Sequence, residues 1–278
     1  VTLLIGAIAA WGIAESVSIA AFVTLVEIGG LLLIIWVGVD SLAELPERWR
    51  ELVPPLDASS WHAIYAGSLL AFFAFIGFED MVEVAEETRR VRRNLPVGII
   101  LTLAITALLY MAIMSTAVIA MEPDELAESP VPLVSLYEHY TGGDGAVISI
   151  IGLFALINGA LIQLIMAARV LYGMSSRKLL PAMISTVNKR TQTPLFATAL
   201  VTMAILLLAI SGTLASLAEA TSLIMLTVFA LVNLSLLYVK QKHPDPQGLI
   251  VFPWIVPLLG FVVSAAFIVS EFLGLVNA

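Results

Sequence analysis

Residues 16–39 read SVSIAAFVTLVEIGGLLLIIWVGV, an apolar run whose single charged residue is Glu27. A transmembrane helix needs about 20 consecutive apolar residues to cross a hydrocarbon core of about 30 Å. This run is long enough, whereas a surface helix of a soluble protein would carry a full polar face. The stretch therefore predicts a membrane-spanning helix.

Further stretches of similar length and apolarity follow along the chain. Together they predict seven full spans, at residues 16–39, 61–78, 96–121, 146–168, 194–212, 218–239 and 249–272. Residues 1–10 are apolar but too short to span, so we expect them to be the end of a helix whose start is missing. The segments do not alternate with period two, which excludes a membrane β-barrel. The predicted fold class is an all-α integral membrane protein.

The composition of the chain agrees with this class. Hydrophobic residues make up 60% and charged residues only 12% of the 278 positions, whereas a soluble domain carries about 25% charged residues. Lipid is therefore the expected surrounding. The net charge of -8 argues against a nucleic-acid partner, because phosphate binding needs clustered cations. Cysteine is absent, which excludes disulfides and thiol chemistry.

The charges are segregated between alternate loops. Eleven of the thirteen basic residues fall in one set of loops: Arg89, Arg90, Arg92, Arg93, Arg169, Arg177, Lys178, Lys189, Arg190, Lys240 and Lys242. Two of the intervening loops are acidic, with Asp40, Glu44, Glu47, Glu51 and Asp57, then Glu122, Asp124, Glu125 and Glu128. Because cytoplasmic loops carry the excess of Lys and Arg, the basic loops are predicted to be cytoplasmic. The expected location is the cell (inner or plasma) membrane, crossed several times.

Signatures of enzymes and metal sites are absent from the sequence. The histidines His62, His139 and His243 are scattered and form no metal-binding motif. Neither a P-loop nor a serine nucleophile elbow occurs. We therefore predict no enzymatic activity and no metal site, and no feature indicates a particular protein partner.

Glu27 lies near the middle of its span, where a carboxylate costs about 2.5–3.5 kcal/mol on insertion scales. Such a residue normally faces a bundle interior or a wet cavity, or it stays protonated. One interpretation is a group that couples transport to a proton or a cation. The other is a neutral side chain that hydrogen-bonds a neighbouring backbone carbonyl and only holds helices together.

The span at residues 146–168 also carries polar groups at mid-membrane. Asn158 is a candidate for lining a cavity, as is Gln163. Gly152, Ala155 and Gly159 lie on one helical face at spacings of three and four, which favours close packing of another helix.

Residues 71–80 read AFFAFIGFED, where an apolar span runs through a glycine directly into acidic residues. One interpretation is a helix broken near Gly77, whose second half lines a water-filled vestibule, as in many secondary transporters. The other is a short helix that ends near Phe78 and continues as an amphipathic cytoplasmic segment. The spacing alone does not decide between them.

Three ordered motifs carry a family resemblance. The first combines FFAFIGFE at residues 72–79, AEET at 85–88 and RNLPVGI at 93–99, and it closely resembles the sixth-helix region of the amino acid–polyamine–organocation permeases. ARVLYGM at 168–174 with Leu180 and Pro181 is similar to the end of their eighth helix. WGIAES at 11–16 is similar to the connection between their fourth and fifth helices.

The resemblance implies a fold of two inverted five-helix repeats. The chain would then be a single transmembrane domain, residues 1–278, holding the end of helix four and helices five to eleven, with the first helices absent. The implied function is secondary active transport of an amino acid or related amine by alternating access, coupled to H⁺ or Na⁺ and without another cofactor. The alternative is a non-transporting scaffold or an inactive half-transporter.

The resemblance also implies roles for particular residues. The backbone at the break of the sixth helix would bind the substrate ammonium, at Phe73, Ala74, Ile76 and Gly77. Neighbouring aromatic side chains would gate the pocket, and we assign this role to Phe72 and Phe75. Some proton-coupled members carry a lysine in the fifth helix, and Glu27 stands at the matching position, so an acid replaces a base there.

Overall fold

The computed structural model describes residues 1–11, 16–243 and 251–277, and every regular element in these ranges is helical. The α-helices are α1 (Thr2–Trp11), α2 (Ser16–Val37), α3 (Val39–Arg48), α4 (Ala58–Phe73), α5 (Asp80–Glu83), α6 (Val91–Ala120), α7 (Pro123–Glu128), α8 (Pro132–Thr141), α9 (Ala146–Ser176), α10 (Leu195–Ser211), α11 (Leu214–Lys242) and α12 (Ile255–Asn277). Two 3₁₀ turns, η1 (Trp49–Leu52) and η2 (Ala85–Glu87), complete the order. The predicted all-α class is confirmed.

Four helices among the described residues are long and apolar enough to cross a membrane, namely α6, α9, α11 and α12. Helices α2 and α3 can make a fifth span as a pair bent by 59°. The sequence predicts seven full spans, and the difference has a local cause. Helix α4 stops after 16 residues, and α10 has 17 residues, or about 26 Å at about 1.5 Å per residue. Neither reaches the thickness of a bilayer core as one straight helix.

Large apolar side chains cover the outer faces of these helices. Leu156 on α9 is 75% exposed and Ile210 on α10 is 84% exposed. A continuous apolar surface of this kind drives association in water, whereas lipid tails solvate it. The exposed surface is therefore that of a protein with several helices in a membrane.

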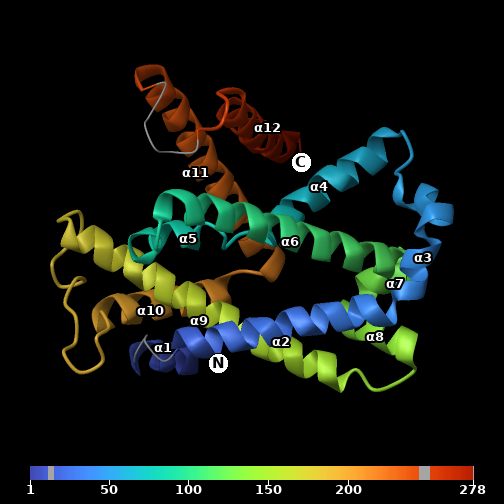
Figure 1. Cartoon of the computed structure of the whole chain (residues 1–278), viewed down its shortest axis with the longest axis horizontal. Helices are drawn as coiled ribbons and strands as arrows, with labels where there is room; N and C mark the ends of the chain where they lie inside the picture. Colours follow the sequence, from blue (N-terminus) through green and yellow to red (C-terminus); the bar gives the residue numbers. More distant parts are fainter. Residues whose placement is uncertain (12–15, 244–250, 278) are drawn as a thin grey trace. The chain divides into compact units, whose positions relative to one another are not determined.

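The chain divides into two compact units. Unit 1 comprises Val1–Leu56 and Leu103–Ile210, and unit 2 comprises Asp57–Thr102 and Ser211–Ala278. In unit 1, α2 packs against α9 and α8, and α1 packs against α9 (Figure 1). One cluster of buried side chains in this unit contains Ile5, Ala9, Leu164, Ala168, Ile184, Ala197 and Val201. A second contains Ile34, Ala117, Met121, Leu136 and Ile148.

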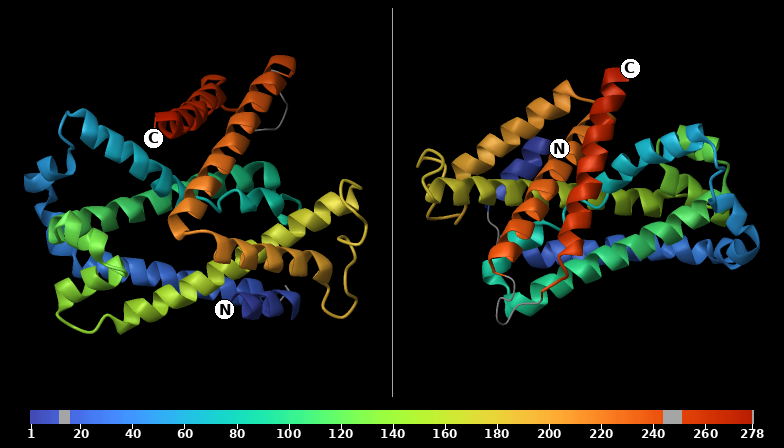
Figure 2. Two further views of the ribbon diagram at one scale, coloured as in Figure 1. Left: turned by 180° about the vertical axis from the view of Figure 1, so that it is seen from behind. Right: turned by 90° about the horizontal axis from the view of Figure 1, so that it is seen from above.

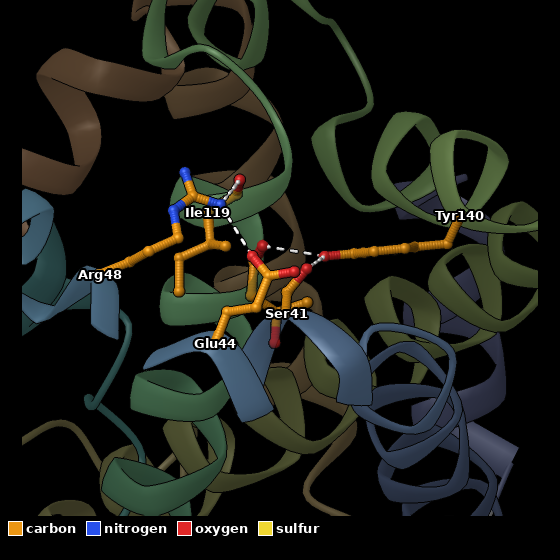
Figure 3. A network of polar contacts seen from close by, with 6 residues as sticks. Ser41, Glu44, Arg48, Ile119 and Tyr140 are labelled. Atoms are coloured by element: carbon orange, nitrogen blue, oxygen red, sulfur yellow. Dashed lines mark hydrogen bonds and ion pairs between the residues drawn. The ribbon is translucent and has the colours of Figure 1, made fainter. Parts of the chain in front are cut away.

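Helix α2 turns into α3 at Gly38, where the chain packs directly against α6 and α8. A Cβ atom at this position would lie 2.2 Å from Cγ2 of Thr116 and 2.9 Å from the ring of Tyr140, so glycine permits the close approach. The Tyr140 hydroxyl donates to the carbonyl oxygen of Thr116 at 3.2 Å and is 2.6 Å from the Ser41 hydroxyl (Figure 3). Because Tyr140 has one hydroxyl proton, Ser41 is the donor of the second bond. We call these contacts the Gly38 bend.

A second polar contact joins α3 to α6 further from the bend. Arg48 forms an ion pair with Glu44, one turn earlier, at 3.3 Å, and it donates to the carbonyl oxygen of Ile119 at 3.2 Å (Figure 3).

Burial raises the pKa of the Tyr140 hydroxyl, which therefore stays neutral and keeps its proton for Thr116 at physiological pH.

In unit 2, α11 packs against both α12 and α4, and the views of Figure 2 show α11 and α12 side by side. The ring of Tyr65 on α4 stacks on Phe267 of α12 with centroids 5.0 Å apart, and its hydroxyl donates to the Phe267 carbonyl oxygen at 3.0 Å. Asp57 caps the start of α4 by accepting from the backbone of Ser60 at 2.8 Å. That bond, with those from the Ser59 and Ser60 hydroxyls, holds the pKa of Asp57 below its usual value.

Candidate functional site

Helix α4 is interrupted between Phe73 and α5, over residues 74–79, which we call the α4–α5 break. Gly77 in the break has a φ of 124°, a backbone conformation that side-chain-bearing residues rarely adopt. The chain resumes as the four residues of α5 and passes through η2 before α6 begins. The regular helix therefore ends before Phe78, the predicted end, and only one further turn follows.

The hydrogen bonds in the break differ from those of a continuous helix. Backbone bonds of 3.0–3.3 Å run from Ala74 to Leu70 and Ala71, from Phe75 to Phe72, and from Ile76 to Phe73. The spacing of three residues marks a tightened 3₁₀ turn. The N–H of Gly77 is bound instead by the carboxylate of Glu79, with Oε2 2.8 Å away. Among the described residues, the carbonyl oxygen of Ile76 accepts no hydrogen bond.

All four residues predicted to bind substrate through their backbone lie at this break or at its edge: Phe73, Ala74, Ile76 and Gly77. They do not present equivalent groups. The carbonyl of Phe73 already accepts from Ile76 at 3.1 Å, whereas that of Ile76 accepts no hydrogen bond from the described part of the chain. Their role in binding stays a prediction, and Ile76 is the position best prepared for it.

An aromatic cluster in unit 2 adjoins the break. The ring of Phe229 on α11 lies 6.0 Å from that of Phe72, edge to face, and 5.7 Å from that of Phe78. The sequence predicts Phe72 as a gating residue. Phe229 has no such signal, because it lies within a continuous apolar run without a distinguishing pattern. Phe75, the other predicted gate, lies inside the break and is partly buried.

One buried side chain ties the end of α4 to α11. The hydroxyl of Ser222 is fully buried and donates to the carbonyl oxygen of Leu69 at 3.0 Å. Leu69 lies one turn before the break. The contact therefore fixes the last regular turn of α4, and with it the point from which the break departs.

In unit 1 the structure brings together two of the three polar residues that the sequence places at mid-span. The amide nitrogen of Asn158 on α9 donates to Oε1 of Glu27 on α2 at 3.0 Å. Asn158 is 8% exposed and Glu27 is partly buried. A hydrogen-bonded side chain on a neighbouring helix lowers the cost of an acidic group at this depth. Glu27 is thus in contact with an amide side chain on a neighbouring helix, and its role stays a prediction.

The small residues of α9 do not form the close helix contact expected of them. A Cβ atom at Gly152 or Gly159 would meet no atom within 4 Å. The close approach between α2 and α9 occurs at Gly30, where a Cβ would lie 3.0 Å from Ile151. The spacing of small residues identified a face of α9, but the packing uses glycine on the partner helix.

The remaining motifs are placed only in part. In the ARVLYGM region, the buried Ser175 hydroxyl donates to the carbonyl oxygen of Pro181 at 2.7 Å and so closes the loop after α9. Of the WGIAES motif, residues 12–15 lie outside the described residues.

The comparison with known proteins gives one family match over the whole chain. The family model described as "Amino acid permease" matches residues 1–278. Three curated relatives are also similar. The vacuolar cationic amino acid transporter 2 of Arabidopsis thaliana is 32% identical over 241 residues, which is 86% of this chain and 38% of the relative.

Two further relatives come from Bacillus subtilis (strain 168). Its branched-chain amino acid permease is 29% identical over 288 residues, covering 95% of this chain and 59% of the relative. Its methylthioribose transporter is 29% identical over 266 residues, covering 93% and 55%. The chain therefore spans between about two fifths and three fifths of the length of these relatives.

Proposed function

The chain belongs to the amino acid permease family, within the amino acid–polyamine–organocation superfamily, and from this premise we propose that it is part of a secondary active transporter working by alternating access. Its substrate is an amino acid or a related amine. The family name and the names of the relatives describe permeases and transporters, not enzymes.

The α4–α5 break is the observation that carries the proposal. Secondary transporters bind small solutes where a membrane helix is discontinuous, because backbone polar groups are then available at mid-membrane depth. The Ile76 carbonyl offers an acceptor there. An acceptor on an uncharged backbone suits an ammonium group, which has three donors and no acceptor.

We assign coupling to Glu27 and Asn158. A carboxyl group changes charge when it takes up or releases a proton, and a change of charge inside a membrane has a large effect on the free energy. Asn158 donates to the carboxylate oxygen of Glu27, and its amide can also accept from a protonated carboxyl through its oxygen. The pair can therefore hold either protonation state, which makes H⁺ the coupling ion that we favour over Na⁺.

The proposal is tested by uptake into proteoliposomes that contain the full-length protein. Relatives are named for cationic amino acids, branched-chain amino acids and methylthioribose, so the panel is arginine, lysine, leucine, valine and methylthioribose. We expect saturable uptake of at least one amino acid, stimulated by an inward proton gradient. Absence of uptake for the whole panel would favour the alternative of a non-transporting component. The cell membrane is the proposed location, which immunogold labelling tests.

Two variants connect uptake to the residues. Ala74→Trp places a large ring in the break and should abolish uptake, whereas unchanged uptake would place the substrate elsewhere. Glu27→Gln replaces the carboxyl group by an amide that can still accept from Asn158, so uptake should lose its stimulation by the proton gradient. The matched control is Glu219→Gln, the same change at an exposed position on α11. An unchanged pH profile in Glu27→Gln would leave Glu27 a structural role.

A further inference from the structure

The side chain of Glu79 points back toward Gly77 and does not cap α5. It stands immediately before α5, in the position from which a side chain normally caps a helix, but it makes no capping bond to α5. Its carboxylate reaches back instead and accepts from the N–H of Gly77 at 2.8 Å. The side chain thus serves the break and not the helix that follows.

The consequence for Ile76 follows from the geometry of the peptide bond. The Ile76 carbonyl and the Gly77 N–H belong to one planar, trans peptide unit, and in such a unit the two groups point in opposite directions. A bond that fixes the N–H therefore fixes the carbonyl oxygen as well. Because Gly77 has unusual conformational freedom, this peptide is the one in the break that most needs an external anchor.

The same contact determines which group of the Ile76–Gly77 peptide is available to a ligand. The N–H groups of Ala74, Phe75 and Ile76 are used in the turn, and Glu79 occupies the N–H of Gly77. An unoccupied N–H at Gly77 would attract the carboxylate of a substrate. With its N–H used, the peptide between Ile76 and Gly77 presents its carbonyl acceptor, which selects for a donor group on the ligand.

We propose that Glu79 is a positioning residue for substrate recognition: by holding the Gly77 N–H, it aims the Ile76 carbonyl oxygen at the substrate ammonium. This role rests on the proposed function, since it concerns the binding of an amino acid at the break. Glu79 itself does not touch the substrate.

Three substitutions separate positioning from charge. Glu79→Gln keeps the length of the side chain and an oxygen that can accept from Gly77, but it removes the charge. Glu79→Asp keeps the charge but is one methylene shorter, and Glu79→Ala removes both. The control is Glu86→Ala, which removes a neighbouring exposed carboxylate on η2. The Gln and Asp variants are close in size to the native residue. Their comparison therefore distinguishes positioning from charge even if Glu79→Ala does not fold.

The readout is the preference for the ammonium group. The measurement is inhibition of the uptake of a transported amino acid into proteoliposomes of the full-length protein. Two pairs of inhibitors are compared: leucine with its deaminated analogue isocaproate, and arginine with its deaminated analogue δ-guanidinovalerate. We expect the ratio of the two inhibition constants in each accepted pair to fall about tenfold in Glu79→Asp and Glu79→Ala, since a charged hydrogen bond is misdirected. It should stay within about twofold of the wild type in Glu79→Gln and Glu86→Ala. General damage to the fold would weaken both members of a pair and leave the ratio unchanged.

The outcomes separate this role from the function on which it rests. If the wild type prefers the amino acid and the ratio is unchanged in Glu79→Asp and Glu79→Ala, Glu79 does not position the carbonyl, while the proposed function stands. An equal fall in Glu79→Gln and Glu79→Asp would also overturn positioning by geometry. If the wild type takes up no member of the panel of arginine, lysine, leucine, valine and methylthioribose, the proposed function falls and this inference falls with it.

Discussion

Two glycines interrupt helices in this chain, one in each unit, and they do so for different physical reasons. Gly38 in unit 1 has an ordinary φ of -95°, but it is buried against Thr116 and Tyr140. Gly77 in unit 2 has a φ of 124° and is only partly buried. The first position lacks space for a side chain, and the second has a backbone that side chains disfavour.

The surroundings of the two glycines indicate a structural role for Gly38 and a role in transport for Gly77. At the Gly38 bend, hydrogen bonds join side chains and carbonyls from different helices, and the site is filled. At the α4–α5 break, turn bonds and the contact between Glu79 and Gly77 lie within the segment, and the Ile76 carbonyl accepts none from the described residues. A filled bend stabilises a packing arrangement, whereas an open one leaves polar groups for a ligand. Substitutions should therefore affect stability at Gly38 and transport at Gly77.

The largest expected effect is that of Gly38→Ala. The new methyl group would overlap Thr116, and neither Thr116 nor Tyr140 has a flexible end there that could move aside. We therefore expect a loss of about 3 kcal/mol in the free energy of unfolding, which is the upper part of the range for overpacking. Denaturant titration of the purified full-length protein in mixed micelles measures it. Gly29→Ala on α2 is the control, because its Cβ would meet no atom within 4 Å and alanine favours a helix. Equal stability of the two variants would contradict the close packing at Gly38.

A smaller effect, on a different quantity, is expected for Gly77→Ala. A side chain at this φ costs about 2 kcal/mol, which the break can relieve by rotating the peptide that carries the Ile76 carbonyl. Transport kcat/KM should then fall about thirtyfold, with little change in thermal midpoint. Gly67→Ala on α4 is the control, since it lies in regular helix and faces open space. A loss of stability without a loss of transport would reverse the assignment of the two glycines.

The smallest effect is expected for Tyr140→Phe. The ring and its packing remain, but the bonds to Ser41 and Thr116 are lost, which should lower the free energy of unfolding by about 1 kcal/mol. A double-mutant cycle with Ser41→Ala measures the coupling between the two hydroxyls. Additive effects would show that the 2.6 Å contact contributes nothing to the bend, and a change in substrate affinity would show that the bend is not purely structural.

Much of the fold could be predicted from the sequence, because hydropathy reports the solvent of each segment directly. The apolar runs predict the helices and the membrane class. The runs could not show where a helix stops within an apolar stretch, as α4 does at Phe73. Hydropathy does not change at that point, and the end of the helix is set by backbone geometry around Gly77.

The candidate site divides in the same way. Glu27 and Asn158 stood out because polar side chains are rare at mid-span, and the structure places them 3.0 Å apart. Their pairing could not be predicted, since nothing in either segment specifies its partner. Phe229 and Ser222 have no sequence signal because both are compatible with any apolar helix. Glu79 was visible only as one member of an acidic run, and its contact with Gly77 depends on the turn between them.

The Gly38 bend also limits how this sequence can diverge. Residues 38, 116 and 140 share one fixed volume, since a Cβ at position 38 would meet both Thr116 and Tyr140. Position 38 can therefore gain a methyl group only where position 116 becomes smaller and the ring at 140 shifts. In descendants of this protein, the three positions should drift together, so that a homologue with alanine at the first carries serine or alanine at the second. The packing at the Gly38 bend would then produce covariation among positions 38, 116 and 140, which lie far apart in the chain.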